Sequence, residues 1–184
     1  LLWVEKLSRV YVLGFGGGRI PMLLHHYYPN VIIESTEIDT DVIELAKRYF
    51  AIEVDARLKV YVEDGRKYIA DKPAEICYDI IMIDAFHGNG YGPYPLSTED
   101  FYKICKSHMT ENSILIFNLL TGDTLYTEKI KTLASVFKNT YLIKADGAHI
   151  LFGTDLPQKT TVELLDKAKE IQSKHKFSFP FVEL

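Results

Sequence analysis

Residues 10–18 read VYVLGFGGG, an apolar run that leads into a cluster of glycines, with Arg19 following directly. The apolar part has the composition of a buried strand, and helical periodicity begins at Arg19. Glycines at such a turn let the backbone approach a ligand and leave the first N–H groups of the helix available to bind it. The stretch therefore predicts a ligand-binding turn formed by Gly14, Gly16, Gly17 and Gly18.

Short apolar runs alternate with segments of helical periodicity along most of the chain, which is typical of βαβ units and a mainly parallel sheet. Near the end, two strand-like runs are separated only by ADGA at 145–148, and an Asp-Gly pair in that position indicates a hairpin. We predict an α/β fold: a doubly wound, mainly parallel seven-stranded sheet with a C-terminal antiparallel hairpin, of the class I methyltransferase-like, Rossmann-like kind. The predicted strands are 9–13, 31–37, 58–62, 78–84, 113–119, 140–144 and 149–153, and the predicted helices are 19–28, 41–50, 66–70, 97–108, 124–137 and 162–174.

The composition of the whole chain narrows the class of protein. Its 184 residues are 47% hydrophobic and 25% charged, which suits a single soluble domain over residues 1–184. No apolar run is long enough to cross a bilayer, and the first residues show no signal-peptide pattern. A net charge of −4 and a pI of about 5.9 give no basic footprint for nucleic acid. We therefore expect a cytoplasmic domain without membrane or nucleic-acid partners.

Cysteines and histidines give no pattern for disulfides or metals. Cys77 and Cys105 are too few and too far apart to define a disulfide framework, so reduced thiols are expected. His25 and His26 are adjacent on a predicted helix and point about 100° apart, so they cannot bind one metal from a single face. We expect no metal site.

The glycine turn does not fit the dinucleotide-binding pattern G-x-G-x-x-G. Counting from Gly14 places Arg19 at the third glycine, and counting from Gly16 places Pro21 there. Pro21 is well tolerated in the first turn of a helix, where its missing N–H costs little. The spacing therefore favours a nucleoside over a dinucleotide.

Two further candidate positions follow the second and third predicted strands. Glu37 can accept hydrogen bonds from both hydroxyls of a ribose, and Asp64, with the free N–H of Gly65, can read an adenine edge. Asp64 alone fits a helix N-cap equally well. Since ligands of open α/β sheets bind at the edge where parallel strands end, the glycine turn and both acids together predict a nucleoside site.

Three longer stretches carry a family resemblance: EIDTDVIELAKRYF at 37–50, VEDGRKYI at 62–69 and YDIIMID at 78–84. Over nearly its whole length the chain resembles the spermidine synthase family. The resemblance implies transfer of an aminopropyl group from decarboxylated S-adenosylmethionine to an amine such as putrescine, on a methyltransferase-like fold. Members carry a small N-terminal β-domain, which we expect this chain to lack.

Asp84 matches the family acid that faces the sulfonium and positions or deprotonates the attacking amine. The role is also sound chemically, because an ammonium must lose a proton before it attacks carbon and a carboxylate within reach can accept that proton. The alternative is an acid that only caps the next segment. The loop HGNGYGPYP at 87–95 can close over a substrate as a lid, which makes His87, Tyr91 and Tyr94 candidate substrate contacts.

Three departures from the family pattern concern the substrates. The family motif GGGDGG holds the amine of the donor tail with an Asp, whereas Arg19 follows the glycines here and can pair with the carboxylate of intact S-adenosylmethionine. His87 stands where the family has a second acid, and the family tryptophan of the final hairpin is missing from 148–154. In these features the chain looks more like a spermidine-synthase-like branch whose members lack an assigned reaction.

We therefore predict a transferase that moves an alkyl group from S-adenosylmethionine, or from its decarboxylated form, to a small acceptor such as an amine or polyamine. Aminopropyl and methyl transfer both remain open, as does a homodimer. Asp84 is the predicted catalytic residue. The alternative from another class is a non-catalytic nucleoside-binding module or partner subunit.

Overall fold

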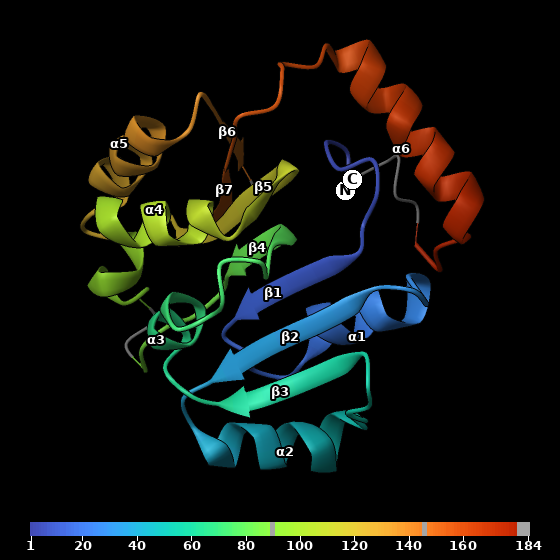
Figure 1. The fold of residues 1–184 in the computed structure, drawn as a ribbon, viewed down its shortest axis with the longest axis vertical. Coiled ribbons are helices and arrows are strands. Elements are labelled where there is room, and N and C mark those ends of the chain that lie inside the picture. The colour runs from blue at the N-terminus through green and yellow to red at the C-terminus, as the bar shows by residue number, and fades with distance from the viewer. Residues whose placement is uncertain (89–90, 145–146, 180–184) are drawn as a thin grey trace.

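The computed structural model describes residues 1–88, 91–144 and 147–179 (Figure 1). Seven strands form one sheet in the order β3-β2-β1-β4-β5-β7-β6. The first five strands pair in parallel, and β7 is antiparallel to both of its neighbours. The predicted fold is confirmed. The elements are β1 (Arg9–Leu13), α1 (Arg19–Tyr27), β2 (Ile32–Glu37), α2 (Thr40–Phe50), β3 (Leu58–Val62), α3 (Gly65–Ala70), β4 (Tyr78–Ile83), the 3-10 helix Tyr94–Ser97, α4 (Glu99–Ser107), β5 (Met109–Leu120), α5 (Tyr126–Val136), β6 (Asn139–Lys144), β7 (Ala148–Thr154) and α6 (Thr161–His175).

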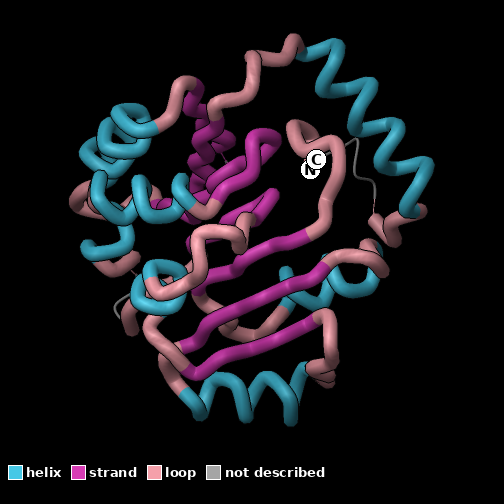
Figure 2. The backbone as a smooth tube through the Cα atoms, viewed as in Figure 1, coloured by secondary structure: helices cyan, strands magenta, loops and turns pink. Residues whose placement is uncertain are grey.

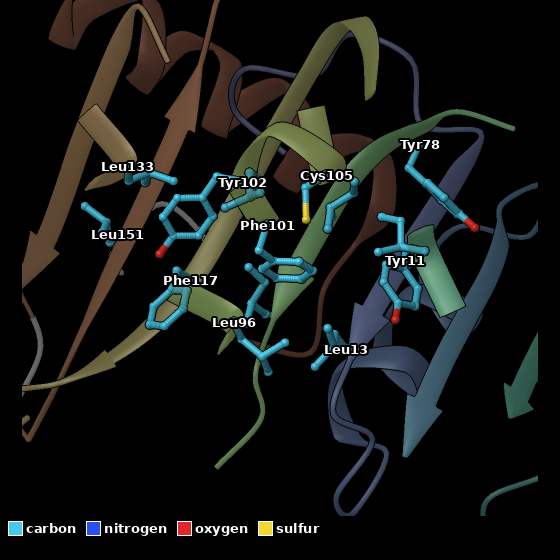
Figure 3. Packing of buried hydrophobic residues seen from close by; sticks show 14 of the residues in the cluster. Tyr11, Leu13, Tyr78, Leu96, Phe101, Tyr102, Cys105, Phe117, Leu133 and Leu151 are labelled. Carbon is cyan, nitrogen blue, oxygen red and sulfur yellow. The ribbon is translucent and has the colours of Figure 1, made fainter. Parts of the chain in front are cut away.

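The helices cover both faces of the sheet, which appears as the magenta layer in Figure 2. On one face, α3, α4 and α5 pack on the central strands, and Figure 3 shows Phe101, Tyr102 and Cys105 of α4 among the buried side chains. On the other face, α1 and the segment before β1 bury Leu24 and Trp3 against the same strands. This double cover explains why the central strands are apolar on both sides.

The region before α4 differs from its prediction. The helix expected over 97–108 begins at Glu99, because Ser97 ends a 3-10 helix and Thr98 is the N-cap. The Thr98 hydroxyl accepts a hydrogen bond from the backbone N–H of Phe101 at 3.3 Å. Two prolines in this loop suit a short 3-10 helix better than a longer α-helix. The prediction from apolar periodicity did not take these prolines into account.

Other boundaries shift as well. β5 begins at Met109 rather than at 113, because Met109 already pairs with Tyr78 before a shift in register. α5 begins at Tyr126 rather than at 124, since Leu125 is its N-cap. The hairpin pairs from Asn139↔Thr154 to Lys144↔His149, and residues 145–146 of the predicted turn at 145–148 lie outside the described residues.

The helices of the described ranges contain none that combines the length and the apolar character needed to span a membrane.

Candidate active site

The glycine turn links β1 to α1, and backbone packing explains two of its glycines. Gly14 has φ 93°, and a Cβ there would lie 2.4 Å from the carbonyl oxygen of Asp84. Gly18 has φ 67° and is the N-cap of α1, where a Cβ would lie 2.7 Å from the Phe15 ring. A Cβ at Gly16 (φ 50°) would have no atom within 4 Å. Gly14 and Gly18 are therefore needed for packing, whereas Gly16 faces open space.

A cleft of about 580 Å³ lies at the edge of the sheet where the parallel strands end. Segments that follow four strands form its walls, so the topology brings together residues far apart in the sequence. The lining includes the predicted site residues Gly14, Gly16, Glu37, Asp64, Gly65, Asp84 and His87. Gly17, Gly18, Arg19, Tyr91 and Tyr94 do not line this cleft. Their contacts with a ligand stay predictions.

Glu37 ends β2 and holds the glycine turn. One of its oxygens accepts hydrogen bonds from the backbone N–H groups of Phe15 (3.2 Å) and Gly16 (3.1 Å). The other accepts from Ile38 (2.9 Å) and Asp39 (3.2 Å). A carboxylate has about four lone-pair positions, so a ribose hydroxyl would replace one of the bonds from the turn. A ligand hydroxyl that bonded to Glu37 would therefore also change the shape of the glycine turn.

Asp64 adopts the N-cap geometry that the sequence left open. Its Oδ1 accepts from the backbone N–H of Lys67 at 2.9 Å, and α3 begins at the next residue, Gly65. A Cβ at Gly65 would lie 2.2 Å from Leu13, so this glycine lets α3 approach the end of β1. The capping role leaves Asp64 exposed and on the wall of the cleft.

Asp84 is the first residue after β4, and it is partly buried and lines the cleft. Asn118 of β5 donates a hydrogen bond from Nδ2 to Asp84 Oδ1 at 2.8 Å. Burial raises the pKa of the Asp84 carboxyl above its usual range, and the bond from Asn118 lowers it by a smaller amount. A raised pKa brings a carboxylate closer to the range in which it takes up and releases protons near neutral pH.

Asn118 was missed by the sequence reasoning. β4 and β5 are parallel neighbours with Ile83 opposite Phe117, so the next residue of each strand places Asp84 beside Asn118. The register of the two predicted strands could have revealed the pair. The Asn118 Oδ1 is buried and has no hydrogen-bond partner among the described residues.

Ile38 and Arg66 are two further lining residues that the sequence reasoning missed. The Ile38 side chain is 72% exposed beside Glu37, so it offers apolar surface that a flat base can cover. Arg66 of α3 donates to the carbonyl oxygen of Pro95 at 2.6 Å and to the Thr98 hydroxyl at 3.0 Å. It therefore fixes the far wall of the cleft.

The loop after β4 forms the other side of the site. The His87 backbone N–H donates to the carbonyl oxygen of Tyr91 at 2.8 Å, and residues 89–90 lie outside the described residues. Tyr91 is 40% exposed and Tyr94 is 65% exposed. The predicted movement of this loop as a lid is not tested by its geometry and stays a prediction.

A buried ion pair is bonded to the same loop. Lys129 of α5 and Asp123 are both almost fully buried, with Nζ and Oδ2 2.6 Å apart. Lys129 Nζ also donates to the carbonyl oxygen of Gly92 at 3.3 Å. The pair therefore ties the end of β5 to the loop whose prolines line the cleft.

Arg19 begins α1 immediately after the glycine turn. Its side chain is exposed and forms no ion pair with any residue that the structure describes. The first turn of α1 contains no acidic residue. Because the N-terminus of a helix favours anions, Arg19 and the start of α1 together present positive potential beside the turn.

Within residues 1–88, 91–144 and 147–179, no group of three or more His, Cys, Asp or Glu side chains is arranged to hold a metal ion. The charged groups of the cleft are Glu37, Glu63, Asp64, Asp84 and Arg66, an excess of negative charge that suits a cationic ligand.

Comparisons with known proteins show which proteins this chain resembles. The human protein named eEF1A lysine and N-terminal methyltransferase is 31% identical over 93% of this chain and 26% of its own length. The polyamine aminopropyltransferase of Vibrio vulnificus is 34% identical over 89% of this chain and 56% of its own length. The chain thus spans about a quarter of the first relative and about half of the second.

The solved structure of human methyltransferase-like protein 13 in complex with SAH superposes with a TM-score of 0.86 at 29% identity, covering 97% of this chain and 86% of that one. A spermidine synthase solved with the transition-state analogue AdoDATO has a TM-score of 0.79 at 18% identity, which supports the shared fold alone. The family model described as the spermine/spermidine synthase domain matches residues 4–146. The chain therefore belongs to the spermine/spermidine synthase domain family.

Proposed function

We propose that this chain is an enzyme domain that transfers a methyl group from S-adenosylmethionine to an amine nitrogen of its acceptor. The observation that carries the proposal is Asp84, a partly buried carboxylate with a raised pKa in the same cleft as the ribose candidate Glu37. Family membership and the relatives named for methyl and aminopropyl transfer support the reaction class.

The residues of the cleft fit the nucleoside part of such a donor. Glu37 offers acceptors for the ribose hydroxyls, and Ile38 offers apolar surface for the adenine. Asp64 and the backbone beside it can accept from or donate to the edge of the base. Gly16 leaves open space where the donor tail would pass the turn.

Asp84 supplies the proton chemistry of the transfer. An acceptor that arrives as an ammonium gives one proton to the Asp84 carboxylate, and the nitrogen lone pair then attacks the methyl carbon. The new N–C bond forms as the C–S bond breaks, which leaves a neutral thioether as the product of the donor. The Asn118 amide stabilises the charged form of the Asp84 carboxylate by donating a hydrogen bond to it.

Methyl transfer is favoured over aminopropyl transfer by the charges around the donor tail and the acceptor. Arg19 would repel the ammonium tail of decarboxylated S-adenosylmethionine but can pair with the carboxylate of the intact form. Among the lining residues that follow β4, Asp84 is the sole carboxylate, so the second ammonium of a polyamine lacks an acid there. Aminopropyl transfer is the second candidate, supported by the family model.

The thiols Cys77 and Cys105 are unpaired in the structure, which supports a reducing compartment such as the cytoplasm. The acceptor that we propose is an amine on a small molecule or on a polypeptide. The relative named as a lysine and N-terminal methyltransferase makes the polypeptide worth testing.

Titration calorimetry with S-adenosylmethionine, its decarboxylated form and the demethylated product tests the donor. We expect intact S-adenosylmethionine to bind about tenfold tighter than the decarboxylated form, equivalent to about 1.4 kcal/mol. Arg19→Glu should reverse that preference, while Lys131→Glu on the exposed side of α5 should leave it unchanged. A preference of the unmodified protein for the decarboxylated ligand would support aminopropyl transfer instead. Absence of binding to all three ligands would reject the reaction class.

A further inference from the structure

A chain of hydrogen bonds joins three elements of the fold beside the cleft. The Tyr11 hydroxyl of β1 donates to the carbonyl oxygen of Gly65, the first residue of α3, at 2.9 Å. The same hydroxyl lies 2.8 Å from the hydroxyl of Thr36 in β2. Because the Gly65 carbonyl can only accept, the single hydroxyl hydrogen of Tyr11 goes to it, and Thr36 must donate to Tyr11. The direction of the chain is therefore fixed, from Thr36 through Tyr11 to Gly65.

Two of the three members line the cleft. Thr36 and Gly65 border it, whereas Tyr11 is fully buried and does not. Asp64, the proposed contact for the edge of the adenine, directly precedes Gly65 on the same wall. The Thr36 carbonyl oxygen also accepts a hydrogen bond from the backbone N–H of Gly14 at 3.0 Å. Tyr11 thus connects the wall that carries Asp64 to the strand that is bonded to the glycine turn, without touching a ligand itself.

Packing holds Tyr11 firmly against α3. Its ring stacks on the ring of Tyr68 of α3, with the centroids 5.4 Å apart and the planes at 28°. A Cβ at Gly65 would lie 2.2 Å from Leu13, so α3 begins in close contact with β1. Burial raises the pKa of the Tyr11 phenol, so the hydroxyl keeps its proton and remains a donor. The start of α3 is therefore held by one hydroxyl in addition to the contact between the rings.

We propose that Tyr11 is a positioning residue for recognition of the donor base, because its hydroxyl fixes the start of α3 and so sets where the Asp64 carboxylate meets the amino group of the adenine. One oxygen of Asp64 accepts from the backbone N–H of Lys67, so the second oxygen can accept from the base. Hydrogen bonds weaken steeply outside a narrow range of length and angle, so a small shift of this wall loses the contact. The inference rests on the proposed function, since it concerns the base of the S-adenosyl donor.

Tyr78 of β4 supplies a matched control for Tyr11. Both tyrosines are fully buried, and their rings are neighbours with centroids 5.6 Å apart. The Tyr78 hydroxyl donates instead to Glu34 Oε2 at 2.5 Å, and neither Tyr78 nor Glu34 lines the cleft. Figure 3 shows the hydroxyl oxygens of Tyr11 and Tyr78 pointing in different directions. Tyr11→Phe and Tyr78→Phe each keep the ring and remove one buried hydrogen bond, but only the first removes a bond to α3.

Titration calorimetry with two forms of the demethylated product tests the role in recognition. One form carries adenine, and the other carries purine, in which a hydrogen replaces the amino group. The unmodified protein should prefer adenine about tenfold or more, since purine has no hydrogen there for Asp64 to accept. Tyr11→Phe should bind the adenine form about tenfold more weakly and prefer it by less than about threefold, while Tyr78→Phe should match the unmodified protein. No preference in the unmodified protein, an unchanged preference in Tyr11→Phe, or the same loss in both variants would each overturn the proposal.

Hydrogen exchange without ligand tests the positioning by itself. The backbone N–H groups of Lys67 and Tyr68 both bond to Asp64 in the first turn of α3. Their exchange should be about tenfold faster in Tyr11→Phe than in the unmodified protein, because the start of α3 opens more readily, and unchanged in Tyr78→Phe. Equal exchange of these groups in the unmodified protein and in Tyr11→Phe would contradict the positioning role.

A second variant and the ligand-free measurement keep the outcomes separate. Thr36→Val breaks the same chain of hydrogen bonds at its other end, so it should speed the same exchange even if Tyr11→Phe does not fold; unchanged exchange in Thr36→Val would then overturn the positioning role. Absence of binding by the unmodified protein would reject the proposed function, and base recognition with it. The exchange measurement decides the positioning of α3 in either case.

Discussion

Asn118→Leu should separate the role of Asp84 as a base from its role in the fold. The substitution removes the hydrogen bond from Asn118 Nδ2 that stabilises the Asp84 carboxylate. A hydrogen bond to a charged group contributes about 1.5 kcal/mol, which corresponds to about a tenfold change in an equilibrium constant. Burial raises the pKa of the Asp84 carboxyl, and the hydrogen bond from Asn118 lowers it. Without that hydrogen bond the pKa therefore rises further.

The sign of the pH effect follows from that pKa. The base function of Asp84 is present above the pKa and is lost as the pH falls through it. In Asn118→Leu the acid side of the profile of kcat/KM against pH should move to higher pH, with a loss of about tenfold at a fixed acidic pH and little loss at alkaline pH. Leucine also removes the buried and unpartnered Oδ1, so the free energy of unfolding should change little.

The assay is transfer of a labelled methyl group followed across the pH range, with Thr121→Val as the matched control. Thr121 follows the same strand, but its backbone and side chain bond to Gly147 rather than to Asp84. Its variant should keep the profile of the unmodified protein. If Asn118→Leu lowers kcat/KM equally at every pH, or leaves the acid side unmoved, the proposed coupling between Asn118 and Asp84 is refuted.

Three further predictions concern the turn, the acids and the buried ion pair. Gly14→Ala should lower the free energy of unfolding by at least about 3 kcal/mol, because its Cβ would lie 2.4 Å from a carbonyl oxygen. Gly16→Ala should cost only about 1 kcal/mol, from its positive φ in open space. Urea unfolding distinguishes the two, and equal losses would contradict the packing argument. Lys129→Met should destabilise the fold by about 3 to 5 kcal/mol, because it leaves Asp123 buried and unpaired. Adding Asp123→Leu should recover most of that loss, and a double variant no better than the single one would count against the ion pair. Glu37→Gln should weaken nucleoside binding about tenfold by calorimetry, since it removes the charged acceptor for the ribose hydroxyls. Unchanged affinity would exclude Glu37 from the site.

The order of strands and helices could be predicted from the sequence. Most parallel strands are short apolar runs, each followed by a segment whose apolar residues recur with helical periodicity. The predicted ends of some elements were wrong where a local hydrogen bond or cap sets the end. The helix expected from 97 begins two residues later because Thr98, rather than Ser97, provides the cap. Nothing in the apolar periodicity distinguishes those two hydroxyl residues, since both precede the same apolar positions.

The acids of the site were predictable because they end strands, and parallel strands end at one edge. Asn118 was not singled out because its role depends on the register between β4 and β5 rather than on a motif. The reason for Gly14 was also only partly accessible from the sequence. Its missing side chain makes room for the Asp84 carbonyl oxygen, which lies 70 positions later in the chain.

We propose that Asp84 performs chemistry in a cleft that binds an S-adenosyl donor. Asp84→Asn keeps the shape of the side chain but removes the base, so it is the most direct test. With a panel of small amines and peptides as acceptors, the variant should bind S-adenosylmethionine within about twofold of the unmodified protein and lose about a hundredfold or more in turnover. Equal turnover in both proteins, or binding without turnover in the unmodified protein over the whole panel, would contradict the account.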